Sequence, residues 1–175
     1  MANGILDTCC LINFYASGHA RAILDALKRP MFLPESVKRE ALYLASSDKA
    51  GERDRIDVEK VAAELHLLVV APETDEELDL YVGLATELDD GEAMALALAK
   101  ARGLTLLTDE RKAGKKATSL SVEVLTTPDV LHVWSESTSA ALVTQAIQCI
   151  EARARYAPFV AHPRYGWWQQ CRAAR

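Results

Sequence analysis

The amino-acid sequence predicts an α/β fold, in which a mostly parallel sheet carries helices on both of its faces. Short apolar runs alternate with longer segments of helical pattern, and this alternation is typical of parallel sheets. The chain has 175 residues, half of them hydrophobic, which suffices for one domain with its own core. No internal repeat, low-complexity stretch or obvious linker interrupts the pattern.

Five short apolar runs are the expected strands, and proline or glycine lies beside several of them. The runs cover residues 5–8, 31–33, 67–70, 104–108 and 122–125. Between them, helices are marked by a proline suited to a first turn, by threonine caps and by a terminal glycine. The expected helices cover residues 20–28, 34–45 (from Pro34), 48–66, 74–87 (capped by Thr74), 89–102 (stopped by Gly103), 128–134 and 138–155 (capped by Thr138).

Charge is distributed unevenly along the chain, although the net charge is −5. Nine acidic residues and no basic one lie between Glu73 and Glu92, so the rest of the chain carries a net charge of +4. A local basic face can bind phosphates despite an acidic total, although basic residues are also ordinary surface charges. The basic residues gather after Asp109 (Arg111, Lys112, Lys115, Lys116) and in the tail (Arg153, Arg155, Arg164, Arg172, Arg175).

The sequence favours a cytoplasmic protein without membrane segments. The apolar stretch over residues 5–15 is interrupted by Asp7 and Asn13, so it does not resemble a signal peptide. No apolar run approaches the length that spans a membrane. The adjacent Cys9 and Cys10 suit neither zinc nor an easy disulfide, and we expect free or buried thiols in a reducing compartment.

Acidic residues at the ends of apolar runs are the strongest functional signal. Asp7 lies at the end of the first expected strand, and Asp109 directly follows the fourth. Ligands of parallel sheets bind beyond the carboxyl ends of the strands, so these two carboxylates face each other if their strands are neighbours. Carboxylate oxygens suit a hard divalent cation such as Mg²⁺ or Mn²⁺.

A third group of acids opens the helix expected at residue 89. Asp89 and Glu92 have the spacing of a capping box, which would explain Glu92 without any metal. Against that reading, Gly91 lowers helix stability, and a glycine here makes sense if something must approach the backbone closely. Asp90 is a second candidate ligand in the same turn.

Two further residues could support the acidic cluster. Glu40 follows the second expected strand, although it could also be a surface acid beside Lys38 and Arg39. Thr108 could donate a hydrogen bond to a phosphate or merely to the backbone.

Four short motifs resemble those of the PIN-domain nucleases, and together they span roughly residues 3–127. Ile-Leu-Asp-Thr at 5–8, with Leu-Ile-Asn at 11–13, resembles the opening of that family. Val-Lys-Arg-Glu at 37–40 and Asp-Gly-Glu-Ala at 90–93 are similar to its second and third acidic motifs. Leu-Thr-Asp-Glu-Arg-Lys-Ala at 107–113 resembles the fourth motif of a VapC-like branch, although Glu110 stands where related sequences often carry aspartate.

This resemblance implies a PIN-like, five-stranded parallel sheet with the first strand beside the fourth. The nuclease domain would cover residues 1–135, and residues 136–175 would form a helix and a tail with Trp167 and Trp168, packed on the domain or on a partner. It also implies an endoribonuclease that uses Mg²⁺ or Mn²⁺. The metal would be held by Asp7, Glu92 and Asp109, with Asp90 in support. Glu40 would complete the set of catalytic acids. The RNA would be bound by Thr108, Arg111, Lys112 and Lys115.

The implied partners are an RNA substrate, a cognate antitoxin protein and a second copy of the chain in a homodimer. Two other functions remain open from the sequence. An aspartyl-phosphate-type phosphatase would use Asp7 as its nucleophile, but Cys9 stands where that chemistry generally wants a second acid. A non-catalytic PIN-like module that binds RNA or protein is the other alternative.

Overall fold

The computed structural model describes residues 2–40, 42–46 and 51–173. The chain forms two compact units, each assembled from separate segments. The first unit contains residues 1–11, 29–40 and 58–126, and the second contains residues 12–28, 41–57 and 127–175. All of the acidic residues singled out in the sequence belong to the first unit.

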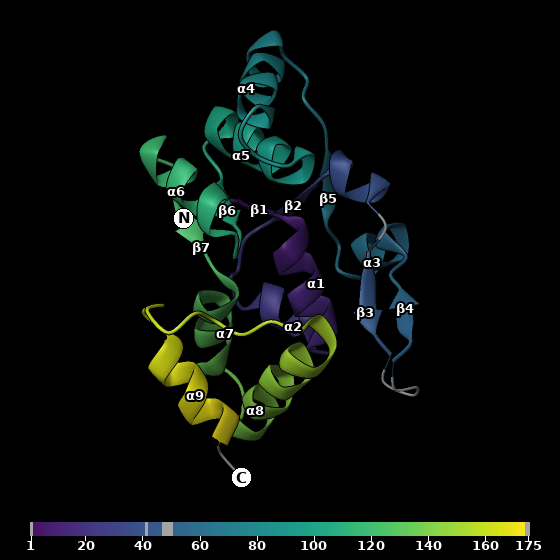
Figure 1. The fold of residues 1–175 in the computed structure, drawn as a ribbon, viewed down its shortest axis with the longest axis vertical. Helices are drawn as coiled ribbons and strands as arrows, with labels where there is room; N and C mark the ends of the chain where they lie inside the picture. Colours follow the sequence, from purple (N-terminus) through teal and green to yellow (C-terminus); the bar gives the residue numbers. More distant parts are fainter. Residues whose placement is uncertain (1, 41, 47–50, 174–175) are drawn as a thin grey trace. The chain divides into compact units, whose positions relative to one another are not determined.

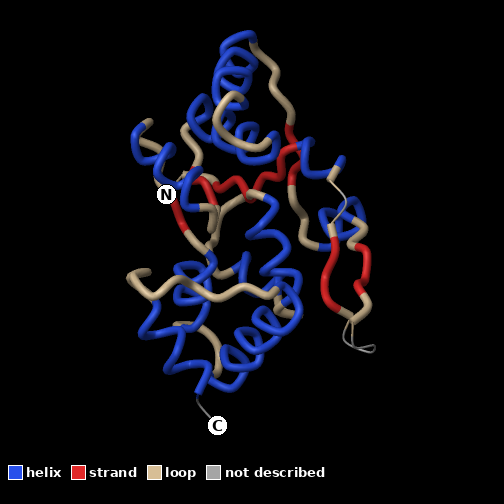
Figure 2. Tube along the Cα trace, in the orientation of Figure 1, coloured by secondary structure: helices blue, strands red, loops and turns tan. Residues whose placement is uncertain are grey.

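A five-stranded parallel sheet forms the centre of the first unit (Figures 1 and 2). Its strand order is β5-β2-β1-β6-β7, so the first strand lies beside the fourth of the expected five. The PIN-like three-layer α/β/α fold class and the strand neighbours are therefore confirmed. The strands are β1 (Gly4–Leu6), β2 (Met31–Pro34), β5 (Leu68–Val70), β6 (Thr105–Leu107) and β7 (Val124–Leu125).

Two helices, α4 (Asp75–Ala85) and α5 (Asp90–Arg102), pack together on one side of this sheet (Figure 1). Their ends match the sequence signals. The side chain of Thr74 accepts a hydrogen bond from the backbone N–H of Glu77, and Gly103 ends α5 in the left-handed conformation with φ of 63°. Alanines and leucines of α5 are buried against Ile5 and Leu106 of the sheet. Gly91, at the start of α5, lies near Thr8, which follows the end of β1.

The segment after β2 differs from the sequence prediction. Pro34 does not begin a helix, because it ends β2 with extended backbone and pairs with Val70 of β5. A 3₁₀ turn, η1 (Glu35–Arg39), follows, and Glu40 is again extended. The remaining helices of this unit are α3 (Val58–Glu64) and α6 (Arg111–Ser119).

The expected helix over residues 48–66 is also wrong over its first half. Strands β3 (Tyr43–Ala45) and β4 (Arg53–Arg55) form an antiparallel hairpin in the second unit, and helical structure begins only at Val58. Leu44 is buried between an exposed Tyr43 and a half-buried Ala45, which is the alternation of a half-buried strand. Residues 47–50 lie outside the described part of the chain.

The second unit is otherwise helical. Its helices are α2 (Ala20–Asp25), α7 (Thr127–Ser135), α8 (Ala140–Cys149), the π-helical turn η2 (Ile150–Ala154) and α9 (Tyr165–Ala173). Ser139 rather than Thr138 caps α8, by accepting a hydrogen bond from the N–H of Leu142. Trp168 is fully buried, and its indole N–H donates to Glu151 at 2.9 Å.

Helix α1 (Thr8–Ala16), which the apolar pattern did not predict, starts directly after Asp7. Over the described ranges, each helix is too short or too polar to pass through a lipid bilayer.

Candidate active site

The candidate site lies at the carboxyl ends of β1 and β6. These strands are neighbours with Leu6 opposite Leu107, and the chain leaves β1 toward β2 on one side but returns to β6 on the other. Parallel sheets bind ligands at such a reversal of strand order. Asp7 is the first residue after β1, and Asp109 is the second after β6. Both residues therefore lie at the point where the strand order reverses.

Asp7 is almost fully buried, with 2% of its surface exposed. Its Oδ1 accepts a hydrogen bond from the N–H of Thr8 at 2.5 Å, and its Oδ2 accepts from the hydroxyl of Thr108 at 2.8 Å and from the thiol of Cys9 at 3.4 Å. Burial raises the pKa of Asp7, the hydrogen bonds oppose that shift, and the nearby Asp109 adds to it. Its position is therefore fixed while its negative charge is poorly compensated.

Glu40 joins the site from the end of η1. Its Oε1 accepts a hydrogen bond from the hydroxyl of Thr8 at 3.0 Å. A Cβ atom added to Gly91 would lie 2.5 Å from the same oxygen. The close approach expected at Gly91 is thus made by the Glu40 carboxylate. Burial raises the pKa of Glu40, and the charges of Asp7, Asp89 and Asp90 raise it further.

Glu92 has the capping contact that its sequence position suggested, while its role as a metal ligand stays a prediction. Its carboxylate accepts a hydrogen bond from the backbone N–H of Asp89, which is one half of a capping box. The Asp89 side chain makes no capping hydrogen bond in return. Burial, followed by the charges of Asp7, Glu110 and Asp89, raises the pKa of Glu92 to about 7. Glu92 therefore lies close enough to the other acids to share their unfavourable field.

Asp90 lies beside Tyr81 of α4 as well as near Glu40. Burial is the main cause that raises the Tyr81 pKa, and the charge of Asp90 and its hydrogen bond with the phenol add to it. Asp90 also contributes to the raised pKa of Glu40. Its role as a supporting metal ligand stays a prediction.

Four residues that the fold brings to this site were not among the predicted site residues. Asp89 and Glu110 contribute to the field around Glu92. Cys9 and Cys10, from the first turn of α1, lie beside Asp109. Asp89 directly precedes the third motif and Glu110 lies within the fourth, but an acid in a polar turn is not by itself a sign of a site. No spacing rule identifies two adjacent cysteines.

The residues expected to bind RNA occupy different environments. Thr108 is buried, and its hydroxyl donates to Asp7, so it orients that carboxylate instead of facing a ligand. Lys112 donates to the backbone carbonyl of Glu87, and Lys116 pairs with the Glu87 carboxylate at 2.7 Å. Arg111 and Lys115 are exposed on α6, so a phosphate has access to their charges.

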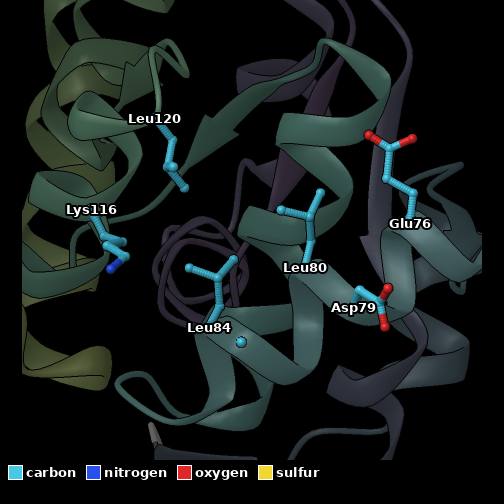
Figure 3. A pocket seen from close by; sticks show the side chains of 7 residues that line it. Glu76, Asp79, Leu80, Leu84, Lys116 and Leu120 are labelled. Carbon is cyan, nitrogen blue, oxygen red and sulfur yellow. The ribbon is translucent and has the colours of Figure 1, made fainter.

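A separate pocket of about 600 Å³ lies between α4 and α6, and it contains none of these acids (Figure 3). Its lining combines three leucines, Leu80, Leu84 and Leu120, with Glu76, Asp79 and Lys116 at its edge. The pocket therefore contains none of the candidate catalytic residues.

The arrangement is suited to a hard divalent cation. Carboxylates of Asp7, Glu40, Glu92 and Glu110 are all harder to ionise than usual because burial and neighbouring negative charges disfavour their charged forms. A cation bound by their oxygens would relieve this repulsion. The fold and the site thus define a parallel α/β protein with a carboxylate-rich, metal-type site where the strand order reverses.

Comparison with known protein families shows which family the chain belongs to. A family model described as a PIN domain, DUF3368, matches residues 4–160. The match covers most of the chain, so the chain belongs to the PIN-domain family, whose members are generally metal-dependent nucleases. Searches among curated proteins and among solved structures gave no significant match.

Proposed function

We propose that this protein is an endoribonuclease that hydrolyses RNA phosphodiester bonds with the help of Mg²⁺ or Mn²⁺. The observation that carries the proposal is the contact chain at the strand ends. Glu40 accepts a hydrogen bond from the Thr8 hydroxyl, and Asp7 accepts from the Thr8 N–H and from the hydroxyl of Thr108. These bonds hold the carboxylates of Asp7 and Glu40 beside the end of β6, from which Asp109 follows. Membership of the PIN-domain family supports nuclease chemistry there.

The roles of the residues follow from the metal-ligand atoms and hydrogen bonds that they supply. Asp7, Glu92 and Asp109 would hold the metal directly or through water, with Asp90 in support, and Glu40 would complete the acidic cluster. When bound, such a cation lowers the pKa of a coordinated water and stabilises negative charge on the phosphate. Thr8 and Thr108 are positioning residues, since their hydrogen bonds keep Glu40 and Asp7 in place.

RNA would be held by positive charge next to the acids. Arg111, Lys112 and Lys115 lie in the first half of α6, within six residues of Asp109. Contacts of this kind position the phosphate backbone without reading its sequence. The similarity of residues 107–113 to a VapC-like motif supports a further role as the cytoplasmic toxin of a toxin-antitoxin pair, acting as a homodimer.

The test is cleavage of labelled RNA by the purified protein. We expect no cleavage in EDTA and recovery on addition of millimolar Mg²⁺ or Mn²⁺. The control variant Asp25→Asn removes an exposed acid of α2 and should retain full activity. Metal-independent cleavage, or none under any metal, would contradict the proposal.

The same preparations test the two other functions. Trapping of a phosphoryl group on Asp7 would support the phosphatase, although the thiol of Cys9 lies where a second carboxyl group would be needed. Binding of RNA without cleavage would support the non-catalytic module.

A further inference from the structure

Two adjacent thiols, which their spacing alone did not suggest as zinc ligands, lie beside a carboxylate of the candidate site. Cys9 and Cys10 begin α1, whereas Asp109 follows β6 almost 100 positions later. One ligand atom from each of the three residues falls within 4.8 Å of the other two. Such a separation matches the spread of ligand atoms around one ion, because Zn–S and Zn–O bonds are about 2.3 and 2.1 Å long.

Individual contacts hold this group together. The Cys10 thiol lies 3.5 Å from Oδ2 of Asp109, and the backbone N–H of Asp109 donates to the sulfur of Cys9 at 3.3 Å. The two thiols are within hydrogen-bonding distance of each other. Cys10 is fully buried, whereas Cys9 and Asp109 are partly exposed, so an ion can reach the group from the solvent side.

The chemistry of these donors differs from that of the surrounding acids. Thiolates select borderline and soft cations such as Zn²⁺, whereas Mg²⁺ and Mn²⁺ prefer oxygen ligands. We propose that Cys9, Cys10 and Asp109 form a binding site for a thiophilic divalent cation, with Zn²⁺ as the natural candidate. Three protein ligands leave a fourth tetrahedral position for water or for Asp7, whose Oδ2 lies 3.4 Å from the Cys9 sulfur.

The proposed site overlaps with the nuclease site, since Asp109 belongs to both. An ion bound by the thiols withdraws the Asp109 carboxylate from the oxygen-rich site. Zn²⁺ is therefore an inhibitor of the Mg²⁺- or Mn²⁺-dependent reaction. This inhibitory effect rests on the proposed function, whereas binding of Zn²⁺ does not.

Co²⁺ tests the binding because its thiolate complexes absorb in the near ultraviolet and its tetrahedral complexes in the visible. Titration of the reduced, metal-free protein with Co²⁺ should give both sets of bands, saturating at one ion per chain, and Zn²⁺ should abolish them. Millimolar Mg²⁺ should leave them unchanged. Absence of a thiolate band in the wild-type protein would overturn the proposal whatever the variants do.

Substitutions of single cysteines show which thiols bind the ion. Cys9→Ser and Cys10→Ser should each reduce the thiolate band to about half and weaken Co²⁺ binding by about tenfold or more, the scale of loss seen even for outer-shell partners. Cys171→Ser removes a partly exposed thiol of α9 and serves as the control. A band that survives the double variant Cys9→Ser/Cys10→Ser, or that disappears in Cys171→Ser, would overturn the assignment.

Inhibition is measured separately, as the ratio of each protein's RNA cleavage rate in Mn²⁺ with and without micromolar Zn²⁺. Zn²⁺ should suppress the wild-type rate at least tenfold, and Cys9→Ser should be less sensitive relative to its own rate. Equal sensitivity of the two proteins would contradict the inhibitory role. A thiolate band in a protein that cleaves no RNA would support the thiol site and count only against the proposed nuclease function.

Discussion

At Gly91 the backbone leaves room for a carboxylate at the cost of helix stability. Gly91→Ala should raise the free energy of unfolding by up to about 1 kcal/mol, because alanine is the better helix residue. The new methyl group would meet Glu40 Oε1 and displace it from Thr8. Misplacement on the scale of 1 Å lowers catalysis on the order of a hundredfold. Chemical denaturation and an RNA cleavage assay measure the two effects.

Gly83→Ala is the matched control for this prediction. Gly83 is also a helical glycine, but a Cβ atom added there meets nothing within 4 Å. This variant should gain stability and retain its activity. If Gly91→Ala behaves in the same way, the Glu40 carboxylate has no part in cleavage.

At Asp7 we expect one substitution to have opposite effects on stability and on function. Asp7→Asn removes a buried charge whose pKa is raised by burial, so the metal-free variant should melt at or above the wild-type temperature. In millimolar Mn²⁺ it should gain less stability than the wild-type protein and lose RNA cleavage. Thermal melts with and without metal check the first part. Full metal-dependent cleavage by the variant would contradict the site assignment.

The raised pKa of Glu92 predicts how the stability of the metal-free protein depends on pH. Its pKa is raised from 4.5 to about 7 in the folded state, so the folded state binds more protons than the unfolded state across that interval. Stability should therefore fall as the pH rises from about 4.5 to about 7. Asp7, Glu40 and Glu110 shift in the same direction.

Denaturation at several pH values measures this slope. Glu92→Gln should flatten it, because glutamine still accepts the hydrogen bond from Asp89 but cannot ionise. Saturating Mn²⁺ should flatten it in the wild-type protein. A wild-type slope of the opposite sign would mean that these acids are not held in an unfavourable field.

How far the site could be predicted depends on how each residue signals its role. Asp7 and Asp109 could be identified because an acid at the end of an apolar run is costly unless it has a function. Glu110 and Asp89 could not be separated from ordinary polar turns, since their proximity depends on strand order. The proximity of Cys9 and Cys10 to the site could not be predicted, because their neighbour Asp109 lies in a distant segment of the chain.

Among the elements, α4 and α5 are joined by a partly buried ion pair that tests the packing of these two helices. Arg102 donates to both carboxylate oxygens of Glu77, at 2.6 and 3.0 Å, and Glu77 is 5% exposed. The hydrogen bonds from Arg102 lower the pKa of Glu77 to about 2. Glu77→Gln should destabilise the protein by about 1.5–3 kcal/mol, because the charge-assisted hydrogen bonds to Arg102 are lost while Arg102 keeps its contacts with Glu73 and the Ala71 carbonyl.

The control is Arg21→Gln, which breaks an exposed ion pair with Asp25 one turn away in α2. Such pairs contribute about 0.5 kcal/mol or less. Chemical denaturation of both variants should separate them clearly. Equal losses would mean that the Glu77–Arg102 pair is no more than a surface interaction.

Elements with local signals were predicted well, and those decided by tertiary pairing were not. Thr74 and Gly103 mark the limits of α4 and α5 through the hydrogen bonds of their own turns. Pro34 is compatible with both a first helical turn and the last position of a strand, and pairing with β5 decides between them. The β3–β4 hairpin was missed because its second strand, Arg53–Arg55, consists of exposed charged residues without an apolar face.

For the molecule as a whole, the uneven charge distribution predicts how RNA binding responds to salt. Each phosphate contact contributes about 0.7 to the slope of log affinity against log salt concentration for single strands. Lys115→Ala and Arg111→Ala should each reduce the slope by about that amount. Lys116→Ala is the control, because Lys116 already pairs with Glu87. Unchanged slopes in the first two variants would assign these residues to an ordinary solvated surface.

The strand order has a consequence for the synthesis of the protein. Asp7 emerges with the first strand, but β6 and Asp109, which complete the site, follow about 100 residues later. At a translation rate of about 5–20 residues per second, that delay lasts about 5–20 s. Pairing of distant parallel strands is itself slow. A ribosome-bound chain therefore contains Asp7 for seconds before the fold can bring Asp109 beside it, and the RNA cleavage that we propose would become possible only late in translation.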